Sequence, residues 1–465
     1  MRPRVYLCGI GGIGMANFAA ILKEVGYDVS GSDGAIYEPA ASVLRSAGIA
    51  VRTPYATDNV PLDGTPLVIG NALFRGHIEV ETALDARVPL YSFPEFLRRS
   101  VLQQRAVVVV AGTHGKSTTT ACLAHLLSAS DPRTGFLVGA LPINFPLGAQ
   151  LGAPDGPFVI EGDEYDTAFF DKRSKFLHYF PSTLVLGSIE YDHADIFSSR
   201  DEMLLAFRRL VNVLPRNGLL VYNADCPETA DLARNAPCPT VSVGVGSNSD
   251  WRWLESGSDL RFLAPDGSEH TVALKLPGRH NRLNALMSVA TAVSSGMSLE
   301  RALDALDSFR GIRRRFELLL HTAQVVVYDD FAHHPTAIAG ALQAAREICP
   351  ARRLVAVLEP RSNTMVRNVF QKELPEVLAV ADEVIIGTIH RLERIPIADR
   401  LDTGRLTTDV AARGVPCRQI ENPGIARCLI ETVVDGPSVV VFMSNGDFGG
   451  VPREFVRLVN EHIKH

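Results

Sequence analysis

The segment with the clearest chemistry is AGTHGKSTTT at positions 111–120. It follows the apolar run AVVVV and precedes a helical pattern, which is the context that a phosphate-binding loop requires. Gly112 and Gly115 let backbone N–H groups approach phosphate oxygens. Lys116 can neutralise the β- and γ-phosphates, and the Ser117 hydroxyl can bind Mg²⁺. A purely structural glycine turn does not explain this order of residue types. We therefore expect ATP to be bound here by Gly112, Thr113, His114, Gly115, Lys116, Ser117 and Thr118.

A dense acidic run follows the apolar strand FVI, with four acids within positions 161–166. Such acids repel one another unless they are solvated or bind cations. A solvated loop is the ordinary interpretation, but this run lies downstream of the phosphate loop, where Mg²⁺ must sit. We therefore expect Ser117, Glu161 and His193 to bind the metal. A lone histidine is more often structural, so the assignment of His193 depends partly on the resemblance described below.

A second glycine turn lies at the start of the chain. Gly9, Gly11 and Gly14 spell G-x-G-x-x-G between a strand and a helix, and Asp33 ends the next strand. Alone this is a dinucleotide-binding fingerprint, which NAD and a UDP-sugar satisfy equally and which a structural turn also imitates. Because the phosphate loop already provides an ATP site, we favour a UDP group here. The expected contacts are Gly9, Gly11, Gly12, Gly14, Met15, Ser32, Asp33 and Asn71.

The elements that must position these groups are β-branched apolar runs that alternate with helical patterns, which is typical of parallel α/β sheets. The length of 465 residues predicts about three domains. We expect an α/β protein with a Rossmann-like N-terminal domain (1–104), a central phosphate-loop ATPase-like domain (105–312) and a Rossmann-like C-terminal domain (313–465). Strands of the third domain are expected at VVVYDD, RLVAVLEP, DEVIIG and SVVVFMSNG.

Composition excludes several classes of protein. Hydrophobic residues make up 46% and the net charge is −6, which indicates a globular chain without the basic field of a non-specific nucleic-acid binder. The apolar run from Val5 to Leu22 contains four glycines and leads into another strand, so we expect neither a targeting segment nor a membrane span. Seven cysteines without a CxxC pair indicate reduced thiols. We expect a cytoplasmic protein without nucleic-acid or membrane partners, and the sequence leaves its oligomeric state open.

Several motifs together resemble one family. GTHGKSTTT, EGDEYD, EYDHADIF, GRHNRLNAL, RRRFE and DDFAHHPTA occur in the order found in Mur ligases, and the resemblance covers essentially the whole chain. The GIGGIGM start and the GSD after the second strand resemble the subgroup that acts on UDP-N-acetylmuramate. The resemblance implies an ATP-dependent ligase, with two Mg²⁺ ions, that joins an amine to a carboxylate through an acyl phosphate in peptidoglycan metabolism.

The same resemblance implies roles for single residues. Asn281 and Asn284 would contact adenine, Asp330 the ribose and Arg315 the γ-phosphate, while His334 would lie near the nucleotide.

For the metal and the reaction itself, the resemblance implies that Glu161 and His193 bind the second magnesium ion, and that Lys116, Arg315 and His193 take part in catalysis. Some members carry a carbamylated lysine that bridges the metals. The FRRLVNVLP segment has no lysine to match it.

Two acceptors fit the subgroup. AFFDKRSKFLHYFP, PINF, LEPRSNTM and MSNGDFGG resemble the enzymes that attach the L-alanyl-γ-D-glutamyl-meso-diaminopimelate tripeptide during peptidoglycan recycling, and L-alanine is the alternative. Arg361, Ser362 and Asn363 follow a strand end and would bind the peptide, with an ordinary surface loop as an equal alternative. The segment 170–176 either contacts the nucleotide sugar or is a solvated charged loop. An NAD-dependent oxidoreductase and a nucleotide-sensing module leave more of the motifs unexplained.

Overall fold

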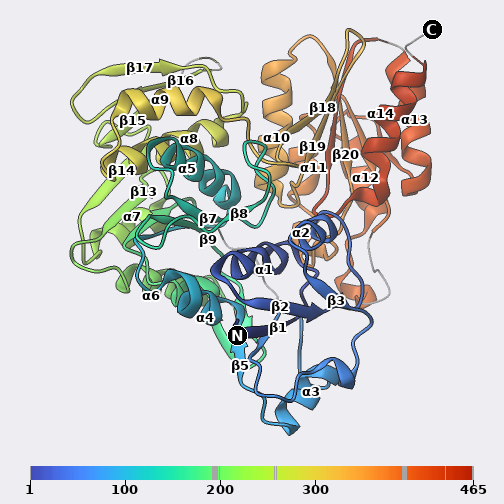
Figure 1. The fold of residues 1–465 in the computed structure, drawn as a ribbon. Coiled ribbons are helices and arrows are strands. Elements are labelled where there is room, and N and C mark those ends of the chain that lie inside the picture. Colours follow the sequence, from blue (N-terminus) through green and yellow to red (C-terminus); the bar gives the residue numbers. More distant parts are fainter. Residues whose placement is uncertain are drawn as a thin grey trace.

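The computed structural model describes residues 2–190, 197, 199–255, 257, 259–389, 395–434 and 436–462. Each of three successive parts of the chain is built around its own sheet, and the three parts lie around a common centre (Figure 1). The predicted three-domain α/β fold is therefore confirmed. His193 lies outside the described residues, so its predicted role as a metal ligand stays a prediction.

The N-terminal domain has five parallel strands in the order β3-β2-β1-β4-β5. The first crossover runs from β1 through the first helix to β2, and a later one returns to β4 on the other side of β1. The glycine turn after β1 therefore lies where the strand order reverses, which is the usual ligand position in such sheets. The strands are β1 Arg4–Cys8, β2 Asp28–Ser32, β3 Ala50–Arg52, β4 Leu67–Ile69 and β5 Leu90–Ser92, and the helices are α1 Ile13–Val25, α2 Ala40–Ser46, α3 Ile78–Asp85 and α4 Phe93–Leu97.

The central domain has a ten-stranded mixed sheet in the order β17-β16-β15-β14-β13-β12-β6-β9-β7-β8. Every residue of β6, sequence VVVVA, is buried, as expected for a central parallel strand covered on both faces. The strands are β6 Val107–Ala111, β7 Gly135–Leu137, β8 Ala149–Gln150, β9 Phe158–Gly162, β12 Thr183–Leu186, β13 Leu219–Asn223, β14 Thr240–Gly244, β15 Trp251–Leu254, β16 Leu260–Leu263 and β17 Glu269–Val272. The helices are α5 Lys116–Ser130, α6 Arg200–Asn212, α7 Pro227–Arg234, α8 Arg279–Ser294 and α9 Leu299–Ser308.

A separate antiparallel pair follows β9 in the central domain. It consists of β10 Asp166–Ala168 and β11 Asp171–Ser174, and the short helix η3 Lys175–His178 comes directly after it. Helix α5, which begins at the phosphate loop, packs against α8, which carries the HNRLN segment. The contact fixes the position of α5.

The C-terminal domain has six strands in the order β18-β19-β23-β20-β21-β22, of which only the edge strand β18 is antiparallel. The strands are β18 Glu317–His321, β19 Val325–Asp330, β20 Arg353–Leu358, β21 Glu383–Ile386, β22 Cys417–Gln419 and β23 Ser438–Met443. The helices are α10 Pro335–Ile348, α11 Leu374–Leu378, α12 Thr403–Ala411, α13 Asn422–Val434 and α14 Val451–His462. The four strands predicted from the sequence correspond to β19, β20, β21 and β23.

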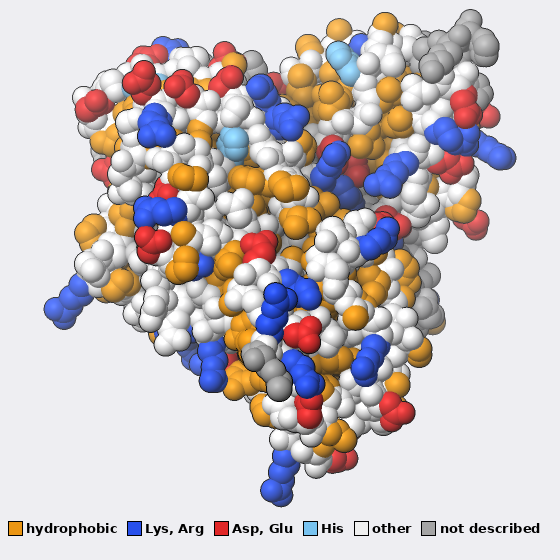
Figure 2. Space-filling model, in the orientation of Figure 1, with side chains coloured by type: hydrophobic (Ala, Val, Ile, Leu, Met, Phe, Trp, Pro, Cys, Tyr) orange, Lys and Arg blue, Asp and Glu red, His pale blue; other side chains and the backbone are white. Residues whose placement is uncertain are grey.

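The distribution of surface charge and the state of the cysteines agree with the expectations from composition. On the face drawn in Figure 2, lysine and arginine side chains are interspersed with aspartate and glutamate. All seven cysteines are free thiols. Among the described residues, no helix has the length and apolarity that a bilayer crossing demands.

Candidate active site

One large cavity, of about 890 Å³, lies where the three domains meet. That volume is within the range of small-molecule binding sites. Residues predicted from six separate motifs line it, so the fold brings them together. They are Gly14, Thr113, His114, Gly115, Lys116, Ser117, Thr118, Glu161, Asn281, Asn284, Arg315, Asp330 and His334.

The phosphate loop connects β6 to α5, which begins at Lys116. Gly115 has a φ of +77°, a backbone conformation that side chains rarely adopt, and a Cβ there would overlap the Asn284 side chain. The glycine is therefore required twice, by the turn and by the approach of α8. This contact also places Asn284 directly beside the phosphate loop.

Lys116 is held inside the cavity by protein oxygens. Its Nζ donates to the backbone carbonyls of Gly112 (2.8 Å) and Thr113 (3.2 Å), and it forms an ion pair with the buried Glu164 at 2.9 Å. Burial alone would lower the pKa of Lys116, but the carboxylates of Glu164 and Asp163 outweigh it and the pKa is raised. The ammonium is therefore charged and positioned before any nucleotide arrives.

The oxygens of Ser117 and Glu161 form the part of the predicted magnesium site that the structure describes. Ser117 Oγ donates to Glu161 Oε1 at 2.8 Å, and the Gly139 N–H donates to Glu161 Oε2 at 2.9 Å. A hydroxyl and a carboxylate beneath a phosphate loop are the hard oxygen ligands that Mg²⁺ takes alongside phosphates. These residues fit the ion, and the backbone bond from Gly139 orients the carboxylate.

Arg315 reaches the cavity from the C-terminal side, between two residues of unusual backbone conformation. Arg314 and Phe316 have φ values of +59° and +53°. Such strain in residues other than glycine persists where surrounding contacts enforce it, often at functional sites. The Arg315 guanidinium lies 4.8 Å from the Phe331 ring centroid, and burial lowers its pKa despite the neighbouring carboxylates of Asp330 and Glu161.

Asp330 ends β19 and is fixed by the same strained segment. Its two carboxylate oxygens accept hydrogen bonds from the backbone N–H groups of Phe316 (2.6 Å) and Ala332 (2.7 Å). Burial raises the pKa of Asp330, and the attraction of Arg315 opposes that rise. Each oxygen keeps a further lone pair, so a ribose contact remains a prediction that this geometry allows.

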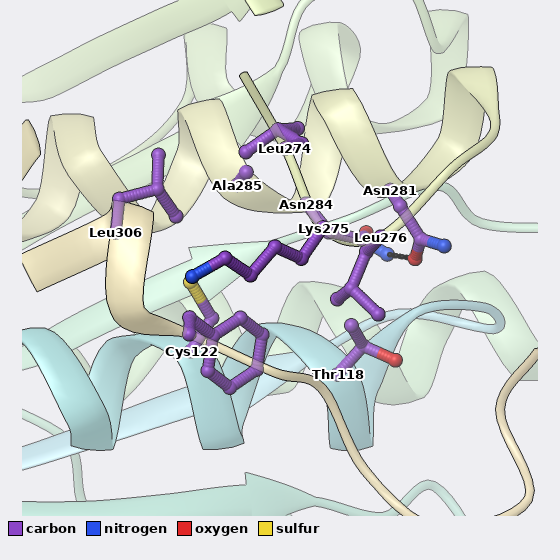
Figure 3. A pocket seen from close by; sticks show the side chains of 10 residues that line it. Thr118, Cys122, Leu274, Lys275, Leu276, Asn281, Asn284, Ala285 and Leu306 are labelled. Atoms are coloured by element: carbon purple, nitrogen blue, oxygen red, sulfur yellow. Dashed lines mark hydrogen bonds between the residues drawn. The ribbon is translucent and has the colours of Figure 1, made fainter. Parts of the chain in front are cut away.

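The two asparagines predicted to contact adenine also line a second, narrow pocket between α5, α8 and the segment 274–276 (Figure 3). Asn281 Nδ2 donates to the Pro277 carbonyl at 2.7 Å, and Asn281 Oδ1 accepts from Asn284 Nδ2 on the next turn at 3.5 Å. This pocket measures about 10 Å³, enough for roughly one water molecule and not for a base. A base would reach these asparagines from the large cavity.

The N-terminal glycine turn is stabilised by Asp33. The Asp33 carboxylate accepts hydrogen bonds from the N–H groups of Gly11 and Gly34, both at 2.7 Å. A Cβ at Gly11 would come within 2.8 Å of that carboxylate. Gly14 lines the large cavity, whereas Gly9, Gly12, Met15 and Asn71 lie around the turn and do not line it.

Ser32, predicted to contact the nucleotide sugar, has a fully buried side chain. Its hydroxyl donates to Glu79 Oε2 at 2.5 Å. The same carboxylate accepts from the Cys8 thiol at 2.8 Å. The Ser32 hydroxyl therefore belongs to an internal polar network, because its place on β2 turns it toward α3, and its contact with a nucleotide sugar stays a prediction.

Glu190 is a cavity residue that the sequence analysis left without a role. Its Oε2 lies 3.1 Å from His114 Nε2 of the phosphate loop and accepts a hydrogen bond from Thr336 Oγ1 of α10 at 2.8 Å. The side chain thus joins the central domain to the C-terminal one. Ligand atoms of His114, Glu190 and His334 all lie within 4.8 Å of one another, so this group could also hold a cation.

The three residues predicted to bind the peptide do not line the large cavity. Arg361 follows β20, with its Nη1 3.7 Å from both Glu359 Oε1 and Asp447 Oδ1. Ser362 Oγ accepts from the Met365 N–H at 3.1 Å, and the Asn363 residue is exposed. They lie at the carboxyl edge of the sheet that also carries Asp330, because β20 and β19 both pair with β23.

Comparison with known protein families agrees with this geometry. Residues 4–105, 110–292 and 314–444 match the models described as the Mur ligase family catalytic domain, the Mur ligase middle domain and the Mur ligase glutamate ligase domain. Together these matches cover most of the chain and follow the three sheets.

Individual proteins are similar over nearly the whole length. A UDP-N-acetylmuramate–L-alanyl-gamma-D-glutamyl-meso-2,6-diaminoheptandioate ligase of Escherichia coli (strain K12) is 36% identical, covering 97% of both chains. A UDP-N-acetylmuramate–L-alanine ligase of Paenarthrobacter aurescens (strain TC1) is 35% identical, covering 87% of this chain and 89% of that one. The crystal structure of a murein peptide ligase from Psychrobacter arcticus 273-4 aligns with a TM-score of 0.74 at 33% identity, covering 98% of each chain. The chain therefore belongs to the Mur ligase family.

Proposed function

We propose that this ligase uses ATP to join the L-alanyl-γ-D-glutamyl-meso-diaminopimelate tripeptide to the lactyl carboxylate of UDP-N-acetylmuramate, in peptidoglycan recycling in the cytoplasm. The observation that carries the chemistry is the convergence of Lys116, the Ser117–Glu161 pair and Arg315 on one cavity. The tripeptide is favoured over L-alanine by the segments that resemble the recycling enzymes and by the similarity to the E. coli ligase over 97% of both chains.

The reaction begins with two anions that must meet. A carboxylate oxygen attacks the γ-phosphorus of ATP, ADP leaves, and an acyl phosphate forms. Lys116 of the central domain and Arg315 of the C-terminal domain both line the cavity, and their charges lower the repulsion between carboxylate and phosphate. Magnesium ions, two in our proposal, would be held by Ser117, Glu161 and His193 and would supply further charge neutralisation.

The second half of the reaction forms the amide. The peptide amine attacks the acyl carbon, the amine loses a proton, and the tetrahedral intermediate expels inorganic phosphate. Positioning supplies much of the acceleration, because the amine must approach from the C-terminal domain while water is excluded. Glu190 contacts His114 of the central domain and Thr336 of the C-terminal domain, and it would hold these two domains together during the reaction.

The test is phosphate release from ATP, Mg²⁺ and UDP-N-acetylmuramate with the tripeptide, with L-alanine, or with neither. We expect release with the tripeptide alone. Release with L-alanine would make the chain an L-alanine ligase instead. Nucleotide binding without acceptor-dependent release would indicate a sensing module, and NAD binding would support the oxidoreductase alternative.

The peptide site is tested separately through Arg361. Removing its guanidinium should raise the KM for the tripeptide about ten-fold or more, since a charge-assisted hydrogen bond to a carboxylate contributes roughly 1.5–3 kcal/mol. The KM for ATP should stay unchanged. An Arg361→Ala enzyme with the wild-type tripeptide KM would show that the peptide binds elsewhere in the C-terminal domain. Arg453→Ala, which removes an exposed guanidinium from helix α14, is the matched control.

A further inference from the structure

The segment 170–176, for which the sequence left two roles open, contains two lysines in different environments. Lys172 on β11 has 71% of its side chain exposed and pairs with Asp166 at 2.5 Å. Lys175, at the start of η3, has only 16% exposed. Lys175 lines the large cavity and Lys172 does not. The segment therefore combines a solvated lysine with a lysine directed into the site.

Lys175 is fixed at both its backbone and its side chain. Its backbone N–H donates to the Tyr165 carbonyl at 2.9 Å, and its Nζ donates to Asp163 Oδ2 at 2.6 Å. The Nζ also lies 5.6 Å from the centroid of the Tyr165 ring. An ammonium has three N–H donors, so the bond to Asp163 leaves donors for a ligand.

Two neighbouring acids connect Lys175 to the phosphate loop. Asp163 accepts a hydrogen bond from Lys175 Nζ at 2.6 Å, and the next residue, Glu164, forms the ion pair with Lys116 at 2.9 Å. Both lysines line the large cavity. A ligand that reaches Lys175 is therefore close to the lysine that we assign to the γ-phosphate.

The neighbours of Lys175 in the cavity indicate which ligand reaches it. Ile13, Gly14 and Phe93 of the N-terminal domain line the same cavity, together with Tyr165 and Tyr179. A sugar whose diphosphate lies on the N-terminal glycine turn would enter from this side, and its carboxylate must continue toward Lys116 to meet the γ-phosphate. A cation placed along that course suits the incoming carboxylate.

We propose that Lys175 binds the lactyl carboxylate of the nucleotide-sugar donor and holds it for attack on the γ-phosphorus. This inference rests on the proposed function, because it needs a donor that carries a carboxylate. The competing explanation is structural: Lys175 only neutralises Asp163. The two explanations differ in which ligand the variant loses and in whether removing the Asp163 charge restores it.

The experiment measures dissociation constants, without ATP, for UDP-N-acetylmuramate and for UDP-N-acetylglucosamine, which lacks the lactyl group. We expect Lys175→Met to weaken UDP-N-acetylmuramate binding about 10- to 100-fold, the loss of one charge-assisted hydrogen bond, and to leave UDP-N-acetylglucosamine binding unchanged. Lys175→Arg should retain most of the preference. Lys172→Met is the matched control and should bind both ligands as the wild type does.

The double variant Asp163→Asn/Lys175→Met separates the two explanations. It should still bind UDP-N-acetylmuramate weakly; recovery of wild-type affinity would show that Lys175 only balances Asp163 and would overturn the proposal. An equal loss for both nucleotide sugars, or no loss, would overturn it too. A wild-type protein that binds the two nucleotide sugars alike would overturn it as well, whereas a wild-type protein without acceptor-dependent phosphate release would refute the proposed function itself.

Discussion

The molecule contains two strand–glycine turn–helix units that look alike in sequence and differ in what fills them. In the N-terminal unit, the Asp33 carboxylate accepts a hydrogen bond from the Gly11 N–H, and residues 9–14 include no lysine or arginine. In the central unit, Lys116 and Ser117 follow the glycines and are paired with Glu164 and Glu161. In the N-terminal turn, an aspartate accepts a hydrogen bond from a backbone N–H group. In the central turn, one glutamate pairs with a lysine and another accepts a hydrogen bond from a serine hydroxyl.

The difference separates binding from chemistry. A turn that offers backbone N–H groups and a helix N-terminus can hold a diphosphate but cannot neutralise a charge that develops during reaction. A turn with a lysine and a metal-binding hydroxyl can do both. Substitutions in the two units should therefore change different constants: nucleotide-sugar affinity for the first, and ATP affinity or turnover for the second.

The largest effect is expected from Lys116→Ala. Turnover should fall on the order of 10³-fold or more, because the charge opposite the γ-phosphate is lost in the transition state. The affinity for UDP-N-acetylmuramate should stay close to that of the wild type and of the surface variant Lys372→Ala, and the protein should still unfold in one cooperative transition. Phosphate-release kinetics and calorimetry measure these quantities. An active Lys116→Ala enzyme would contradict the assignment of the phosphate loop.

Gly115→Ala tests the second glycine of the loop. The added Cβ meets the Asn284 side chain, and the backbone there has a φ of +77°, so ATP affinity should fall about 10- to 100-fold. Nucleotide-sugar affinity should not change. Gly267→Ala is the control, because its φ is +83° and nothing lies within 4 Å of its Cβ. An equal loss of ATP binding in that variant would mean that backbone strain alone is responsible.

Gly11→Ala should have a smaller effect, and on the affinity for the nucleotide sugar instead of ATP. Its Cβ would press on Asp33 Oδ2 at 2.8 Å and displace the carboxylate that stabilises the turn. We expect UDP-N-acetylmuramate affinity to fall about ten-fold, since one positioning hydrogen bond of roughly 1–1.5 kcal/mol is lost. ATP affinity should be unchanged. Gly246→Ala, whose nearest neighbour is 3.8 Å away, serves as the comparison, and a loss of ATP affinity in Gly11→Ala would break the division between the two turns.

The smallest effect is expected in the third sheet. Burial raises the pKa of Asp329 from 3.8 to about 6, although Arg314 opposes the rise. The folded chain therefore keeps a proton that the unfolded chain has released, and the free energy of unfolding falls as the pH rises through this window, by at most about 3 kcal/mol. In Asp329→Asn, the difference in melting temperature between pH 5 and pH 7.5 should shrink. A difference as large as that of the wild type would rule out this carboxyl as its source.

Local patterns were sufficient for most of the architecture. The buried run VVVV before the phosphate loop, and VVVYDD before the third-domain aspartates, became β6 and β19 because continuous β-branched segments have few alternatives to a buried parallel strand. The Gly-Lys-Ser order predicted a phosphate loop, and that loop lines the central cavity. This prediction was possible because the glycine that the turn requires and the side chains that bind phosphate are adjacent in the sequence.

Contacts between domains were not predictable in this way. Glu190 meets His114 across 76 residues and Thr336 across 146, and no local periodicity encodes either distance. Lys172 and Lys175 have the same residue type in one charged segment, and only the turn from β11 into η3 exposes one and buries the other. The bond from Ser32 to Glu79 was not predictable for a related reason, because the two residues are 47 positions apart.

The pairing of Lys116 with Glu164, and of Ser117 with Glu161, has a consequence for how the nucleotide enters. The groups that would receive the triphosphate already have partners, so ATP binding is an exchange in which phosphate oxygens replace carboxylate oxygens. The free energy of binding is then a difference between two similar interactions. An ammonium that changes one anion for another alters the local charge balance little, and the released carboxylates become available to the cation that accompanies ATP.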